Sequence, residues 1–220
     1  MTSHGFTARA LLVASLLAAG PLVVVRTVHA QQTAPDLATV LRRIEAARAQ
    51  LQTLDAEFDQ ERVMGLFAQT LHAHGRISVQ RPDHVRWEIV TPHPGVFTID
   101  GRRVAYTAGG SSAAANQNQI GPLGAVLGDL AAFLGGSLSA LGERYTLSVA
   151  AADHGAVVLT AVPRDPQVSH VISMVRLRFG SDLRVIERIE MDEPGGDRST
   201  IQMVAPRVNG RPVPLSSAAP

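Results

Sequence analysis

The stretch from Gly75 to Tyr106 constrains the fold of this chain more than any other part of the sequence. Within it, apolar residues alternate with polar ones, which is the two-residue period of a strand that buries one face. The apolar members of the first two strands are Ile77, Val79, Val85, Trp87 and Ile89. Their common face predicts one wall of an apolar interior.

Turn-forming residues separate these strands at short intervals. Pro82 ends the first strand, because proline has no amide donor and restricts the residue before it. Pro92 and Pro94 interrupt the chain again, and Asp100-Gly101 suits a tight hairpin between strands at 96–99 and 104–106. Four strands with such short links predict an antiparallel meander.

The order and spacing of these residues resemble a known family. Gly75, Arg81-Pro82-Asp83, Arg86-Trp87-Glu88, Pro92 and Asp100-Gly101 are similar to the motif of the LolA-like family of bacterial periplasmic carriers of outer-membrane lipoproteins. The resemblance implies an α+β fold: a strongly curved antiparallel sheet, open like a half-barrel, with helices covering its concave apolar face. It covers most of the chain after the leader.

The same resemblance implies a function and partners. Carriers of this family accept lipoproteins from an inner-membrane lipoprotein-releasing transporter and transfer them to an outer-membrane acceptor. Arg81 corresponds to an arginine that hydrogen-bonds to the lid helices and holds the empty form closed. The aromatic-rich segment that many of these carriers have near residues 108–119 is absent here. Cargo other than lipoproteins therefore stays open as an alternative.

Composition excludes several other classes of protein. A net charge of +1 and an aromatic content of 4% argue against a nucleic-acid partner. The chain contains no cysteine, so disulfides, thiolate metal sites and a lipid-modified cysteine are excluded. His72 and His74 lie two apart but lack the further ligands that zinc requires. We expect no metal, no cofactor and a monomer.

Residues 1–30 have the pattern of an export signal. An apolar run from Ala8 to Val25 precedes Val28-His29-Ala30, a small-x-small cleavage sequence. An uncleaved anchor is the alternative, but Pro21 and the polar residues at 31–33 favour cleavage near Ala30. We expect a periplasmic protein with a single domain from 31 to 220 and a flexible tail after about residue 206.

An amphipathic helix is predicted to begin at Asp36, a good N-cap residue. Its arginines, Arg48 included, are expected on the solvent side, and the helix serves either as core packing or as part of a lid. A strand follows at 53–63, with Phe58 on its inner face and four carboxylates on its outer face. The expected apolar stripe of the helix is Leu37, Val40, Leu41, Ile44, Leu51 and Leu54.

Two segments in the middle of the chain differ from the strands around them. Residues 108–119 are small and polar without periodicity, which predicts a flexible loop. Residues 122–134 form an apolar helix whose only charge is Asp129. Its glycines weaken it in isolation, so it either fills the core or acts as a displaceable lid. Further strands are predicted from Tyr145 to Val204.

These patterns leave three classes of function to compare. The sequence contains no known catalytic motif, and the spacing of its polar residues does not bring them together, so we expect no enzyme. A protein-interaction module would use an exposed sheet edge, whereas a carrier would enclose acyl chains in an apolar cavity. The carrier hypothesis is favoured, with lipoproteins or lipid acyl chains as cargo. The expected cavity residues are Phe58, Ile77, Val79, Val85, Trp87, Ile89, Leu127, Leu130 and Phe133.

Overall fold

The alternating sequence folds into one large antiparallel sheet. The structure, a computed structural model, describes residues 36–66, 69–116, 121–135 and 137–216, with the backbone only at 121–123. The strands in these residues are β1 (Thr53–Met64), β2 (Gln69–Gln80), β3 (His84–Thr91), β4 (Gly95–Asp100), β5 (Arg103–Ala108), β6 (Ser111–Asn116), β7 (Tyr145–Ala151), β8 (Val157–Pro163), β9 (Met174–Phe179), β10 (Ile186–Asp192), β11 (Arg198–Val208) and β12 (Arg211–Pro212).

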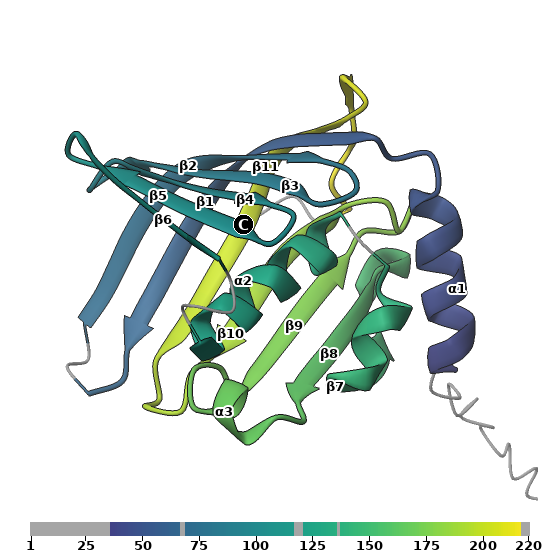
Figure 1. The fold of residues 1–220 in the computed structure, drawn as a ribbon. Coiled ribbons are helices and arrows are strands. Elements are labelled where there is room, and N and C mark those ends of the chain that lie inside the picture. Colours follow the sequence, from purple (N-terminus) through teal and green to yellow (C-terminus); the bar gives the residue numbers. More distant parts are fainter. Residues whose placement is uncertain (1–35, 67–68, 117–120, 136, 217–220) are drawn as a thin grey trace, which may run out of the picture. The chain divides into compact units, whose positions relative to one another are not determined.

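The sheet is open, with β6 at one edge and β7 at the other. Its strand order is β6-β5-β4-β3-β2-β1-β11-β10-β9-β8-β7, and β12 pairs with β11. Figure 1 shows the sheet bending, so that β3–β6 and β8–β10 face each other across its concave side. This arrangement confirms the expected open, strongly curved antiparallel sheet.

One long helix lies along the concave side, between the two halves of the sheet (Figure 1). This is α2 (Gly121–Leu134), whose buried residues Ala131, Phe133 and Leu134 join the apolar core. The first helix, α1 (Leu37–Arg48), packs beside β7. The short elements are η2 (Ser139–Glu143), η3 (Asp153–Gly155) and α3 (Pro166–Ser169). The prediction that helices cover the apolar face is thus confirmed.

The predicted meander is present as β2–β5, and a glycine determines how it packs. A Cβ on Gly75 would lie 2.1 Å from the Glu88 carbonyl oxygen and 2.5 Å from the ring of Phe58. The missing side chain lets the Phe58 ring, which is fully buried, cross over β2. It reaches Trp87 on β3 with ring centroids 4.7 Å apart. Gly75 therefore permits an aromatic contact across three strands.

The predicted N-terminal helix begins where expected but ends earlier. The Asp36 side chain accepts a hydrogen bond from the amide of Thr39 at 2.9 Å, which is the predicted N-cap. The helix ends at Arg48, so Leu51 and Leu54, assigned to its stripe, lie in the following turn and in β1. Arg48, expected on the solvent side, is buried. The apolar pattern of α1 runs on past the end of the helix into β1, so spacing alone does not mark where the helix ends.

The loop predicted at 108–119 is wrong for residue 108 and for residues 111–116, which are strand, and its last three residues lie outside the described residues. Gly109 and Gly110 both have positive φ, 56° and 82°, and turn the chain back on itself. Residues 111–116 then pair with β5 as the edge strand β6. Backbone pairing needs no side-chain alternation when neither face of an edge strand is deeply buried. A sequence of serine and alanine therefore gave no strand pattern.

The two ends of the chain compare differently with expectation. The predicted export signal lies outside the described residues, and residues 34–220 form one compact unit. Past Pro206, where a flexible tail was expected, β11 continues to Val208 and pairs with β12. Ser216 then donates two hydrogen bonds to Glu187. Within the described residues, no helix combines the length and the apolar character needed to cross a membrane.

Candidate binding cavity

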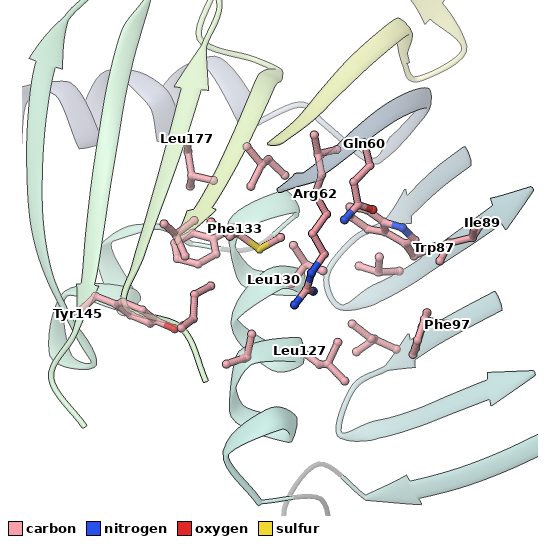
Figure 2. Close-up of a pocket in the computed structure, with 18 residues that line it drawn as sticks. Gln60, Arg62, Trp87, Ile89, Phe97, Leu127, Leu130, Phe133, Tyr145 and Leu177 are labelled. Carbon is pink, nitrogen blue, oxygen red and sulfur yellow. The ribbon is translucent and has the colours of Figure 1, made fainter. Parts of the chain in front are cut away.

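An apolar cavity of about 330 Å³ lies between α2 and the concave face of the sheet. Its volume falls in the range of pockets that hold small organic ligands. Figure 2 shows Leu127, Leu130 and Phe133 projecting from α2 toward it, with Trp87, Ile89 and Phe97 on the facing strands. Alternation on β3 and helical spacing on α2 direct these side chains to a common space.

Six of the nine predicted cavity residues line this space: Val85, Trp87, Ile89, Leu127, Leu130 and Phe133. The other three, Phe58, Ile77 and Val79, are buried but are not among its lining residues. Phe58 lies one layer behind, against Trp87. Val79 lies under the end of α2, where a Cβ on Gly135 would approach its Cγ1 to 2.9 Å. Strand alternation predicted the shared face, but not that Val85 and Trp87 on β3 line the cavity while their partners Val79 and Ile77 on β2 do not.

Sequence reasoning missed the opposite wall. The residues there belong to β9, β10, β11 and the segment just before β9: Ile172, Val175, Leu177, Ile189, Met191 and Ile201. Val175 and Leu177 alternate on β9, and Ile189 and Met191 alternate on β10. That alternation could have placed them on one face. Only the bend of the sheet could show that this face meets the meander across a cavity.

Polar groups also line the cavity, and they too were missed. Gln60 and Arg62 follow Phe58 on the inner face of β1, at the two-residue period of a strand. Arg62 Nη2 donates to Glu193 Oε2 at 2.9 Å and to Asp197 Oδ2 at 3.0 Å. Figure 2 shows both side chains among the apolar ones. The cavity is thus apolar with a polar group on its β1 side.

The buried carboxylate of Asp129 connects α2 to the start of β7. Asp129 is 2% exposed, and Tyr145 donates a hydrogen bond to its Oδ2 at 2.5 Å. Its Oδ1 forms an ion pair with Arg144. Burial raises the pKa of Asp129, and these two partners offset only part of that effect. Burial and the adjacent Asp129 raise the pKa of Tyr145, so its hydroxyl stays protonated and donates.

A buried arginine holds the C-terminal end of α2. Arg48 is 5% exposed and donates from Nη1 to the Phe133 carbonyl at 3.1 Å and from Nη2 to the Leu134 carbonyl. These carbonyls end a helix and lack intrahelical partners. The guanidinium also lies 5.9 Å from the ring centroid of Phe179. Burial, with a smaller contribution from the charge of Arg81, lowers the pKa of Arg48 to about 10. The side chain therefore stays protonated at neutral pH.

Arg81, predicted to bind the lid helices, contacts the end of α1. Its Nη1 donates to the carbonyl of Arg48 at 2.9 Å. It thus supports the residue that binds α2, while Arg48 itself contacts the α2 carbonyls. Glu45 adds to the same junction by accepting from Ser137 Oγ at 3.0 Å and from the Ser139 amide at 3.1 Å. Polar residues of α1 therefore hold the segment where α2 ends.

The family model for "Outer membrane lipoprotein carrier protein LolA" matches residues 49–214. This chain belongs to the LolA family. The match includes the meander, α2 and the second half of the sheet, and so all residues that line the cavity. It confirms the resemblance stated from the sequence.

Two curated members of the LolA family are similar in sequence. The outer-membrane lipoprotein carrier protein of Dechloromonas aromatica is 29% identical over 136 residues, 61% of this chain and 62% of that protein. The match therefore spans less than two thirds of that relative. The protein of the same name from Chromohalobacter salexigens is 26% identical over 169 residues, 76% of each chain.

Solved structures that resemble this chain are more distant in sequence. A LolA superfamily protein from Nitrosomonas europaea gives a TM-score of 0.47 at 13% identity, covering 82% of this chain and 96% of that one. The lipoprotein LppX of Mycobacterium tuberculosis gives a TM-score of 0.43 at 11% identity, covering 82% and 100%.

Proposed function

We propose that this protein is a periplasmic carrier that binds the acyl chains of lipoproteins in the cavity under α2 and transfers them from the inner to the outer membrane. The observation that carries the proposal is the cavity itself, about 330 Å³ and lined mainly by aliphatic and aromatic side chains. Transfer of apolar surface from water drives such binding, at about 0.8 kcal/mol for each methylene buried. Family membership supports lipoproteins as the cargo.

The partners follow from the same proposal. An inner-membrane lipoprotein-releasing transporter supplies the cargo, an outer-membrane acceptor receives it, and the chain acts without a chemical step. The predicted export signal at 1–30 and the names of the two curated relatives support the periplasm as its location. Mass spectrometry of gently purified protein tests the cargo. Bound lipoprotein supports the proposal, and another bound lipid alone would contradict it.

Trp87 provides a direct test of acyl binding, because it is the only tryptophan and lines the cavity. We expect its fluorescence to change when a palmitoylated peptide is added, and not when the unacylated peptide is added. Leu130→Gln should weaken binding about fivefold, since a half-buried leucine contributes about 1 kcal/mol of apolar contact. Leu66→Gln, at a residue 82% exposed, is the matched control. An unchanged affinity of the Leu130 variant would contradict the assignment.

A further inference from the structure

Two side chains that line the cavity carry uncharged hydrogen-bond donors, Gln60 on β1 and Trp87 on β3. The Gln60 amide and the Trp87 indole N–H form no hydrogen bond with any side chain or backbone group in the described residues. Trp87 is 9% exposed and Gln60 is half-buried. Both residues line the cavity, so their free donors are available to a ligand there.

The charge around Arg62 restricts what that ligand is. Arg62 Nη2 is shared between the carboxylates of Glu193 and Asp197, and its hydrogen bond lowers the pKa of Asp197, which stays ionised. Two carboxylates that do not line the cavity thus offset the positive charge of Arg62. An anionic head group therefore gains little attraction from this guanidinium, whereas a neutral acceptor does not need it.

The donors themselves also suit a neutral acceptor. An amide N–H and an indole N–H are uncharged, so they offset less of the desolvation cost of a carboxylate or phosphate than a cationic side chain would. An ester carbonyl is a neutral acceptor and needs only a donor within hydrogen-bond distance. The apolar remainder of the lining accommodates the chains attached to such an ester.

We propose that Gln60 and Trp87 form a subsite for the ester carbonyls of a neutral acylglycerol group, placed where the acyl chains enter the apolar cavity. This inference rests on the proposed acyl-binding function and adds a chemical class to it. The subsite selects esterified acyl chains over ionised fatty acids and over ether-linked or plain alkyl chains.

Matched soluble ligands test the subsite by titration calorimetry with the full mature chain. Dihexanoylglycerol and dihexylglycerol ether have equal chains but differ in their carbonyls. We expect the ester to bind about 3- to 10-fold tighter, which is the effect of one net hydrogen bond. Hexanoate at neutral pH should bind more weakly than either. Equal affinities for ester and ether, or tighter binding of hexanoate, would overturn the subsite while leaving the carrier intact.

Two variants assign the preference to residues. Gln60→Met removes the amide at nearly equal volume, and Trp87→Phe removes the N–H but keeps a ring. Each should reduce the ratio of ester to ether affinity, measured within the same variant, toward unity, because only the ester loses a hydrogen bond. Gln80→Met, on an exposed position at the end of β2, is the control and should keep the full preference. Retention of the preference in both cavity variants would overturn the assignment. If no ligand binds the unsubstituted chain, the proposed function fails with it.

Discussion

Arg48, the last residue of α1, donates a hydrogen bond to the carbonyl oxygen of Phe133, near the end of α2, at 3.1 Å. The contact joins residues that are 85 positions apart in the sequence, and it fixes the C-terminal end of α2. The guanidinium is protonated and has no carboxylate partner in the described residues. Its charge is instead offset by helix-end carbonyls, which carry the negative end of the helix dipole.

Arg48→Met should lower the free energy of unfolding by about 2 kcal/mol, because two buried carbonyls lose a charged donor. Arg48→Lys keeps the charge but not the fixed geometry by which two guanidinium nitrogens donate to two carbonyls, so an intermediate loss of stability is expected. Urea unfolding measures both. Arg43→Met, at an exposed position of the same helix, should change stability by less than about 0.5 kcal/mol. Equal effects at positions 43 and 48 would contradict the role of Arg48.

Arg81→Leu should accept cargo but release it poorly. The side chain holds the carbonyl of Arg48 in place, so its loss weakens the support of the empty, closed arrangement. Transfer of a fluorescent acylated peptide to acceptor vesicles measures release. Arg102→Leu, in the exposed β4–β5 turn, serves as the control. Release by the Arg81 variant at the normal rate would show that the hydrogen bond has no part in closure.

Helix α2 should open unevenly when cargo binds. Its C-terminal residues are buried and held by Arg48, whereas Ala125, Val126 and Leu127 are only half-buried. Hydrogen exchange should therefore become faster with a bound acylated peptide at 125–128 and remain slow at 129–135, which Asp129 and Arg48 hold. Uniform protection of both halves with and without peptide would make α2 ordinary core.

Asp129→Asn should remove a pH-dependent contribution to stability. The pKa of Asp129 is raised in the folded chain above the unfolded value of 3.8, so folding favours its protonated form. That stabilisation is complete below pH 3.8 and is lost as the pH rises through the raised folded pKa. The stability of the unsubstituted chain relative to the asparagine variant should therefore grow as pH falls from 7 toward 4. Urea unfolding at several pH values measures it, and a constant difference would contradict the prediction.

Gly75→Ala should destabilise the fold by about 1–3 kcal/mol, through overpacking. The new methyl group would meet a backbone oxygen as well as the Phe58 ring, so a rotamer change alone would not relieve it. Thermal and urea unfolding measure the loss. Gly142→Ala is the matched control, because a Cβ there meets nothing within 4 Å. If the two variants are equally stable, the close approach at Gly75 is not limiting.

The sequence determined the features that depend on local pattern. Period-two alternation specified β1–β5 and their inner face, and Asp36 specified the start of α1, because these signals depend on neighbours along the chain. The same patterns identified six residues of the cavity wall, from Val85 on β3 to Phe133 on α2. The order of the turn residues was enough to indicate the family.

Tertiary structure decided everything that depends on distant partners. Arg48 looked like a solvent-facing residue because helical spacing records only where a side chain points, not what covers it. Strand β6 has no alternation, since its stability comes from backbone pairing with β5. The second wall of the cavity and the free donors of Gln60 and Trp87 depend on the bend of the sheet. That bend arises from cooperative pairing of strands that are distant in the sequence, such as β1 with β11, where Leu54 pairs with Val208, and no local window contains both.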